Sequence, residues 1–245
     1  MAIDGVVFEL RGVDHEDQRR AMITAFNGDL DGFYARRLLF LRPSDGEMRI
    51  EGEGSRYTSP FRTLCYILEG NAQVKLSGNK EKPENYNLCV QDGQRARLLV
   101  PKFVNYEIKV ESGSILALAS EMGDNFGMYG AGSRAKTALS TAFQQNFRAE
   151  QVKFALMKID ARLADHYHPD YREFFYMLKG EADFTLELID SKERTQEHLN
   201  PGDHLLISPR VGHKALVKQG SVLVGCTEKP YISAAINDCP YTIED

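Results

Sequence analysis

The stretch DHYHPDYRE, residues 165–173, decides how this chain is interpreted. Side chains alternate between the two faces of an extended strand, so His166 and His168 share one face. The Pro-Asp pair that follows them signals a turn. The turn allows Glu173 to come back from the next strand toward the two histidines.

A further histidine, His213, lies downstream in the stretch SPRVGH, residues 208–213. Three imidazoles and one carboxylate suit Fe, Mn, Ni, Co or Zn as a divalent ion, and they leave coordination positions open for water or substrate. His166, His168, Glu173 and His213 therefore predict one divalent transition metal ion, held as in a reacting centre. The remaining histidines, His15, His198 and His204, are expected at the surface or in a barrel wall.

The chain contains an internal repeat. Residues 56–70 align without a gap on residues 166–180, and the match resumes where 100–104 meet 208–212 and where 113–116 meet 220–223. A long period with matching motifs at both ends indicates duplicated domains. The first copy differs from the second at every ligand position, where it has Arg56, Thr58, Thr63 and either Asn105 or Tyr106. We therefore expect the first copy to lack metal ligands.

Within each copy, short apolar runs are bounded by Gly, Pro, Asn or Asp, which predicts an all-β chain of antiparallel barrels or sandwiches. The predicted boundaries are a first barrel at 1–121, a linker at 122–148 and a metal-binding barrel at 149–245. A short helix is expected at 15–26, and some helix at 133–145. By strand parity, Phe175 and Met177 should point into the barrel with Glu173. The repeat-equivalent Tyr66 and Tyr176 should pack structurally.

Composition limits the classes of function. The net charge of −5 comes with no long basic run, so a nucleic-acid partner is not expected. No apolar run is long enough to cross a bilayer, and the N-terminus lacks a signal-peptide pattern, which predicts a cytoplasmic protein with no membrane partner. The four cysteines are scattered without a CxxC pair, and Cys65 and Cys89 are expected as small buried side chains.

The second half resembles the cupin superfamily, whose members are small jelly-roll barrels with two signature motifs. The first motif is matched by His166-x-His168, four residues, Glu173, six residues and Gly180, and the second by Gly202-Asp203, Pro209 and His213. One departure is Asp160, which stands where the family has a glycine. The resemblance implies two tandem cupin barrels, a bicupin.

The first half, residues 8–120, more loosely resembles the dTDP-sugar 3,4-ketoisomerase-like cupins through segments 33–40, 65–74 and 116–120. That family has two catalytic histidines before its central strand, and both are missing from segment 54–58 here. The resemblance therefore favours a scaffolding role for this barrel and does not carry the ketoisomerase activity over to it.

From the resemblance we expect a metal-dependent enzyme that acts on a small polar, carbohydrate-like substrate, with isomerase or epimerase chemistry as the first hypothesis. A metal-dependent dioxygenase and a binding protein without turnover are the alternatives, and the catalytic residues are not assigned. Arg162, Lys214, Arg56 and Arg62 could meet an anionic substrate or lie at the surface. A homodimer through edge strands is also possible in a cupin, although two barrels in one chain already offer that interface.

Overall fold

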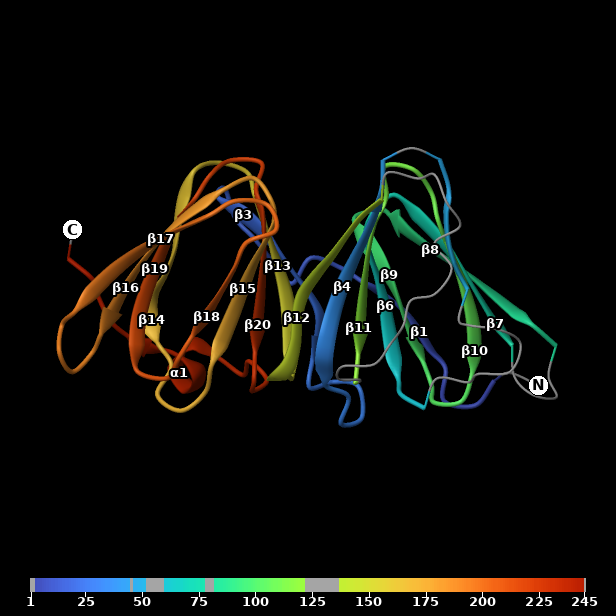
Figure 1. Ribbon diagram of the computed structural model, residues 1–245, viewed down its shortest axis with the longest axis horizontal. Helices are drawn as coiled ribbons and strands as arrows, with labels where there is room; N and C mark the ends of the chain where they lie inside the picture. The colour runs from blue at the N-terminus through green and yellow to red at the C-terminus, as the bar shows by residue number, and fades with distance from the viewer. Residues whose placement is uncertain (1–2, 45, 52–59, 78–81, 122–136, 245) are drawn as a thin grey trace. The chain divides into compact units, whose positions relative to one another are not determined.

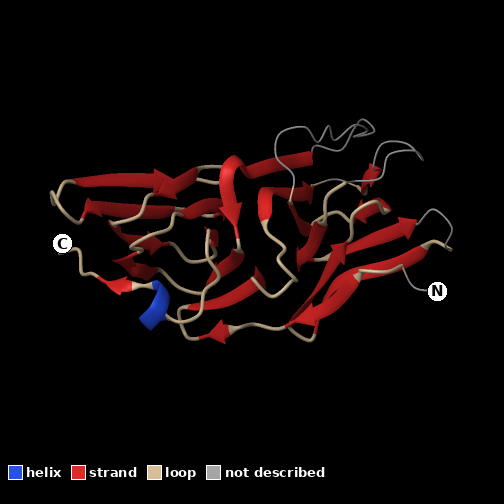
Figure 2. Cartoon of the chain, turned by 90° about the horizontal axis from the view of Figure 1, so that it is seen from below, coloured by secondary structure: helices blue, strands red, loops and turns tan. Residues whose placement is uncertain are grey.

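The computed structural model describes residues 3–44, 46–51, 60–77, 82–121 and 137–244, and strands account for nearly all of its regular structure (Figures 1 and 2). The described chain forms two compact units, and its strands confirm the prediction of an all-β chain. Unit 1 comprises Met1–Gly12 and Phe33–Phe147, and unit 2 comprises Val13–Gly32 and Arg148–Asp245. The described residues contain no helix with the length and apolarity that a membrane crossing requires.

Unit 1 is built on one 10-stranded sheet in the order β12-β4-β11-β6-β9-β8-β7-β10-β5, with β1 added beside β9. Alternating side chains from these strands fill its interior with Leu, Val, Ile and Ala. The strands are β1 (Val7–Arg11), β4 (Ala35–Pro43), β5 (Met48–Glu51), β6 (Thr63–Glu69), β7 (Asn71–Ser77), β8 (Glu84–Gln91), β9 (Gln94–Val100), β10 (Asn105–Val110), β11 (Ile115–Ser120) and β12 (Thr137–Ala149).

Unit 2 has a six-stranded sheet, β18-β15-β20-β13-β3-β2, and a five-stranded sheet, β17-β16-β19-β14-β21. Apolar side chains from both sheets share one core, which includes the inward-pointing Phe175 and Met177, as predicted. Its elements are β2 (His15–Glu16), β3 (Arg20–Asn27), β13 (Gln151–Met157), β14 (Ala161–Tyr167), β15 (Glu173–Lys179), β16 (Ala182–Leu188), β17 (Arg194–Leu199), β18 (His204–Ile207), β19 (Val211–Val217), β20 (Val222–Thr227), α1 (Ala234–Asn237) and β21 (Cys239–Pro240).

The repeat detected in the sequence is also a repeat of structure. β6 and β15 hold matching residues, and they pair with β11 and β20, which also begin with matching residues of the repeat. Gly70 and Gly180 end these two strands with φ of 73° and 81°. A Cβ at either position would lie within 3 Å of the Cα of Ser114 or Ser221. Both turns therefore require glycine for backbone conformation and for space.

Two segments depart from the predicted boundaries. β3 directly precedes β4 in the chain but pairs with β13, while β12 directly precedes β13 but lies beside β4. The predicted helix at 15–26 was wrong, because these residues form β2 and β3 of unit 2. The helix expected within 133–145 was wrong for 137–145, which belong to β12. The predicted domain boundary around 122–132 lies outside the described residues.

The cysteines and the repeat-equivalent tyrosines follow the sequence interpretation with one exception. All four cysteines are free. Cys65 is buried, but Cys89 is only half-buried because it faces outward from β8. Tyr66 and Tyr176 are both buried in the packing of their units, as expected.

Candidate metal centre

The predicted ligands come from both sheets of unit 2. Strands β14 and β19 of one sheet and the start of β15 in the other bring them together. His166 near the end of β14 pairs directly with His213 on β19. Glu173 opens β15. The register of β14 shifts between Ala164 and His166, and both Ala164 and Asp165 have a positive φ, of 68° and 82°. This strained bulge turns the strand immediately before the ligand pair, as bulges beside functional sites do.

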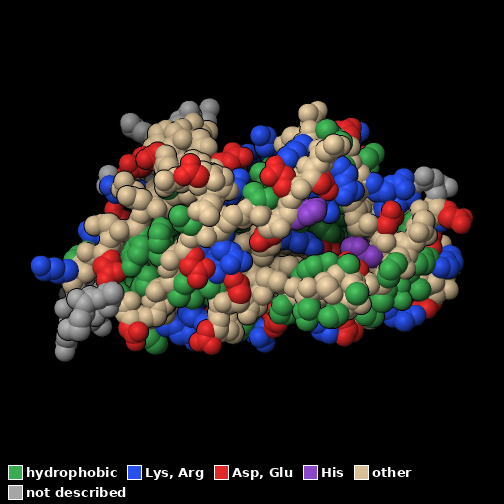
Figure 3. Space-filling model, turned by 180° about the vertical axis from the view of Figure 1, so that it is seen from behind, with side chains coloured by type: hydrophobic (Ala, Val, Ile, Leu, Met, Phe, Trp, Pro, Cys, Tyr) green, Lys and Arg blue, Asp and Glu red, His purple; other side chains and the backbone are tan. Residues whose placement is uncertain are grey.

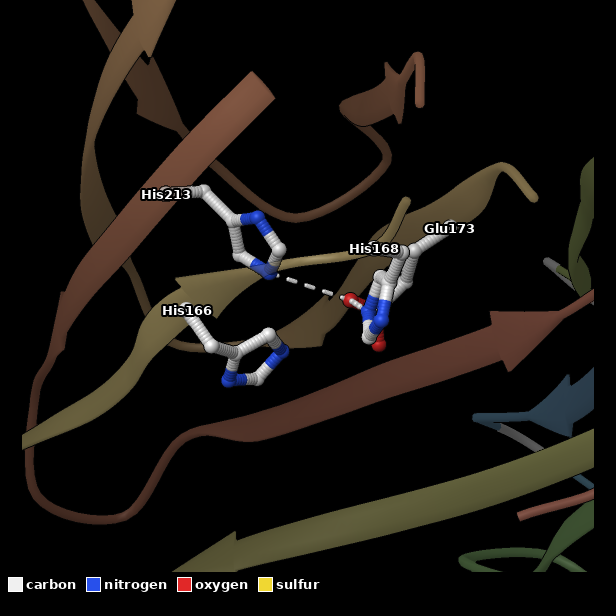
Figure 4. Close-up of side chains that lie close together, drawn as sticks. All are labelled: His166, His168, Glu173 and His213. Atoms are coloured by element: carbon white, nitrogen blue, oxygen red, sulfur yellow. Dashed lines mark hydrogen bonds and ion pairs between the residues drawn. The ribbon is translucent and has the colours of Figure 1, made fainter. Parts of the chain in front are cut away.

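The four side chains converge on one point (Figure 4). One ligand atom from each lies within 4.8 Å of all the others. His168 Nε2 lies 2.9 Å from Glu173 Oε2, and His213 Nε2 lies 3.1 Å from the same oxygen. Within the described ranges, this is the only cluster of three or more His, Cys, Asp or Glu side chains in such an arrangement.

Backbone carbonyls hold two of the imidazoles in a ligating orientation. His168 Nδ1 donates to the carbonyl of Asn237 at 2.9 Å, and His213 Nδ1 donates to the carbonyl of Val211 at 3.2 Å. Tyr171 also donates to the Asn237 carbonyl, at 3.0 Å. Each Nδ1 hydrogen bond leaves Nε2 facing the cluster, which is the arrangement found around metal-bound histidines.

Burial and contacts within the cluster shift the pKa values of His166, His168 and Glu173. Burial, together with the neighbouring His213, lowers the pKa of His166 to about 3. Burial also acts to lower the pKa of His168, but its hydrogen bond to Glu173 outweighs this and raises the pKa above the ordinary value of 6.5. Burial acts to raise the pKa of Glu173, but Lys153 and the histidines hold it well below 4.5.

The cluster fits a divalent transition metal on two observations. Its donor set is three imidazole nitrogens and one carboxylate, which first-row metals accept. His213 Nε2 is buried and has no hydrogen-bond donor, because Nδ1 carries the proton and the neighbour of Nε2, at 3.1 Å, is the Glu173 carboxylate. A buried acceptor without a donor calls for a further partner. His166, His168, Glu173 and His213 could therefore hold one such ion, with positions left open to the adjoining cavity.

Lys153 on β13 is a component of the site that the sequence interpretation missed. Its Nζ lies 3.3 Å from Glu173 Oε1, and three quarters of the side chain is buried. It reaches this place across Gly225 of β20, where an added Cβ would lie 2.8 Å from the Lys153 Cε. A lysine that faces inward from an apolar strand, in the sequence QVKFALM, was the available signal.

The cluster borders a cavity of about 600 Å³ that lies within unit 2. Its polar lining includes Lys153, Arg20 of β3, Tyr231 and Asp238. The Asp238 carboxylate lies 3.8 Å from His166 Nε2 and 3.7 Å from His168 Nδ1. Burial raises its pKa against the opposing effect of His168. Figure 3 shows histidine, Lys and Arg side chains gathered at a hollow in the surface.

The other histidines stay away from the ligand cluster. His198 is exposed and pairs with Asp183, and His204 is exposed and stacks on Phe174, as expected for surface and wall residues. His15 is exposed too, but it also lines the cavity.

Three of the basic residues singled out in the sequence lie in described parts of the chain, and none of these three lines the cavity. Lys214 donates to the carbonyl of Ile243, and Arg162 is exposed on β14. Arg62 forms an ion pair with Glu121 in unit 1. Arg56 lies outside the described residues.

In unit 1, two ligand positions can be compared directly. Thr63 opens β6 as Glu173 opens β15. Tyr106 pairs with Leu76 as His213 pairs with Leu186, so tyrosine takes the place of the second-motif histidine. The Tyr106 side chain is hydrogen-bonded to Thr63, and burial raises its pKa to about 12. The positions of the first two histidines, Arg56 and Thr58, lie outside the described residues.

Comparison with known proteins agrees with this geometry. Residues 155–221, which hold all four ligands, match the family model described as the cupin domain. The C-terminal barrel is similar to the cupin domain over these residues. No curated protein sequence matches the chain.

Solved structures extend the likeness in fold to most of the chain. A deletion mutant of the oxalate decarboxylase OxdC of Bacillus subtilis is 12% identical, with a TM-score of 0.52 over 93% of this chain and 79% of that one. A second structure of the B. subtilis enzyme, described by its Mn(II) centres, is 10% identical, with a TM-score of 0.51 over the same shares. The oxalate decarboxylase of Lactobacillus farciminis is 11% identical, with a TM-score of 0.48 over 92% and 87%. At these identities the two B. subtilis structures support the bicupin fold alone.

Proposed function

We propose that unit 2 is a metal-dependent enzyme that isomerises or epimerises a small polar substrate. The observation that carries the proposal is the placement of Lys153 and Asp238 in one cavity on the ligand cluster. A cavity of about 600 Å³ is in the size range of small-molecule sites. A cluster that only stabilised the fold would have no need of a lysine and a carboxylate beside it.

His166, His168, Glu173 and His213 would hold the ion. When bound, the metal supplies a Lewis acid that polarises a carbonyl oxygen. Asp238, a partly buried carboxylate whose pKa is raised, is suited to take a proton from the carbon next to that carbonyl. The same carboxyl would return the proton to the neighbouring carbon, while the proton of the substrate hydroxyl passes to the former carbonyl oxygen, so that carbonyl and hydroxyl exchange places. Lys153 would donate a hydrogen bond to the oxygen on which negative charge develops.

The ligand assignment can be tested separately from turnover. We expect His166→Ala and His213→Ala to lose more metal affinity than the roughly 10–100-fold typical of a supporting residue, and to keep their strand content by circular dichroism. His198→Ala is the matched control, because this histidine is exposed and away from the cluster. Metal analysis of the purified proteins measures the effect. Stoichiometric metal in both ligand variants would show that the assignment is wrong.

The reaction can be tested by proton exchange. Metal-replete protein in deuterated buffer should incorporate deuterium into small hydroxy-carbonyl compounds, with dihydroxyacetone and xylulose as first probes. Asp238→Asn should lower the exchange rate by about 10²–10⁴-fold while metal content stays unchanged. Oxygen uptake without exchange would replace this proposal with the dioxygenase hypothesis. Neither exchange nor uptake would favour a binding protein.

A further inference from the structure

The cavity contains a second cation that the proposed reaction does not use. Arg20 lies on β3, in the N-terminal segment that joins unit 2, and its side chain lines the cavity together with Lys153. The Arg20 Nε atom is buried and makes no hydrogen bond. Asp17 is the acidic residue nearest to Arg20 in the sequence, and its carboxylate binds the Arg19 guanidinium at 2.8 Å. From Arg20 it accepts only the backbone N–H.

A buried guanidinium nitrogen without a partner is costly, because its desolvation is not repaid by a hydrogen bond. Such groups in folded proteins call for a partner that binds later. Burial also lowers the pKa of Arg20, although an arginine stays charged in proteins. The partner that suits the planar fork of a guanidinium is a group with two anionic oxygens.

We infer that Arg20 binds an anionic oxygen group of the substrate, so that the enzyme acts on a small acid. This inference rests on the proposed function only for the role of the cavity as the active site. Lys153 lies beside the metal ligands, so the acid would be bound with its reacting carbonyl toward the cluster. Asp14 and Asp238 also line the cavity, and they repel a second anionic group there. The site therefore favours a substrate with one carboxylate or one phosphate.

Binding of chosen acids to the full-length, zinc-loaded protein tests the inference by calorimetry. The probes are pyruvate, inorganic phosphate and pyruvamide, which keeps the shape of pyruvate without its charge. At least one of the two anions should bind about tenfold or more tightly than pyruvamide. Arg20→Gln should weaken that binding by about 10–100-fold, the range for a hydrogen bond to a charged group. Which anion binds distinguishes a carboxylate substrate from a phosphate ester.

Arg19→Gln is the matched control, since Arg19 is exposed and already paired with Asp17. It should leave anion binding unchanged within about twofold, the effect of a surface charge. Thermal unfolding separates binding from a structural role. Without an anion, Arg20→Gln should be at least as stable as the parent chain, because it removes an unpartnered buried group. With the anion, only the parent chain should gain stability.

Equal binding of pyruvamide, unchanged binding in Arg20→Gln, or no binding of either anion overturns the inference. The two proposals fail in different ways. Anion binding that depends on Arg20 but comes without proton exchange overturns the isomerase proposal and leaves the anion site. Proton exchange in small hydroxy-carbonyl compounds, together with anion binding that is unchanged in Arg20→Gln, overturns the anion site and leaves the isomerase.

Discussion

Two histidines of the cluster, His166 and His168, differ in how they hold a proton, and this sets the pH dependence of metal binding. A ligating imidazole must be neutral at the nitrogen that binds. His166, with a pKa of about 3, is neutral at every pH at which the protein would be studied. The pKa of His168 is raised above 6.5 by Glu173. A metal ion must therefore displace a proton from His168 and none from His166.

We predict that metal affinity falls as the pH drops through the raised pKa of His168. One displaced proton corresponds to about a tenfold loss of affinity per pH unit. Chelator competition between pH 8 and pH 5.5 measures the slope, and His198→Ala should reproduce that of the parent chain. Affinity that stays constant from pH 8 to pH 6 would contradict the assignment of the proton to His168.

How far single residues could be predicted depended on the kind of signal each one carries. His166, His168, Glu173 and His213 were accessible from the sequence because strand alternation and motif spacing are local properties. Lys153 carried only the weak signal of one lysine within an apolar strand, and Arg20 carried none that separates it from a surface arginine. Their shared cavity depends on the pairing of β3 with β13, which brings together residues more than a hundred positions apart.

At the level of elements, the segment after β20 completes the surroundings of the ligands. The Asn237 side chain accepts from the backbone N–H groups of Ile232 and Ser233 and donates to the carbonyl of Pro230. This fixes the short turn that includes α1. The carbonyl of the same residue accepts from His168 Nδ1. The side chain thus holds the backbone group that orients a ligand.

We predict that Asn237→Ala lowers metal affinity by about 10–100-fold, the usual effect of losing a supporting partner, although Asn237 touches no metal. Ile236→Ala is the control, since its side chain is 64% exposed one residue earlier. Chelator competition measures both variants. Equal affinities would show that the turn holds its shape without the Asn237 side chain.

The glycine that ends β15 supports a prediction about stability. Gly180 and Gly220 both have a positive φ, of 81° and 76°, but only Gly180 has a backbone atom in the way of a Cβ. Gly220→Ala should therefore lower the free energy of unfolding by about 1–2 kcal/mol, the cost of the left-handed conformation. Gly180→Ala should lose about 1–3 kcal/mol more from overpacking against Ser221. Urea titrations compare the two, and equal losses would mean that Ser221 yields freely.

For the whole molecule, the repeat was visible in the sequence. The strand exchange, in which β3 belongs to unit 2 and β12 lies beside β4 of unit 1, was not. Residues 20–27, RAMITAFN, have the mixture of small and apolar side chains that fits a helix or a strand. Only pairing with β13 decides the matter, because tertiary context overrides local preference. The same holds for β12, which lies at the edge of the sheet in unit 1. The two barrels were predicted from motifs, whereas their exact membership depends on contacts distant in sequence.

The strand exchange predicts which parts of the chain respond to metal. Ligand binding stabilises the unit that holds the site, by about 2.7 kcal/mol when the free metal is at 100 times its Kd. Slow amide exchange reports the stability of such cooperative units. Metal should therefore raise the protection of amides in β3 together with those of β13, β15 and β20, while amides in β6 and β11 of unit 1 change little.

The response of β3 is decisive, because the sequence alone places residues 20–27 in the first barrel. Hydrogen–deuterium exchange read by mass spectrometry, with His213→Ala as the metal-free reference, makes the comparison. If the amide protection of β3 changed as little as that of β6 and β11, the N-terminal segment would not belong to the metal-binding unit, and Arg20 would not line the cavity.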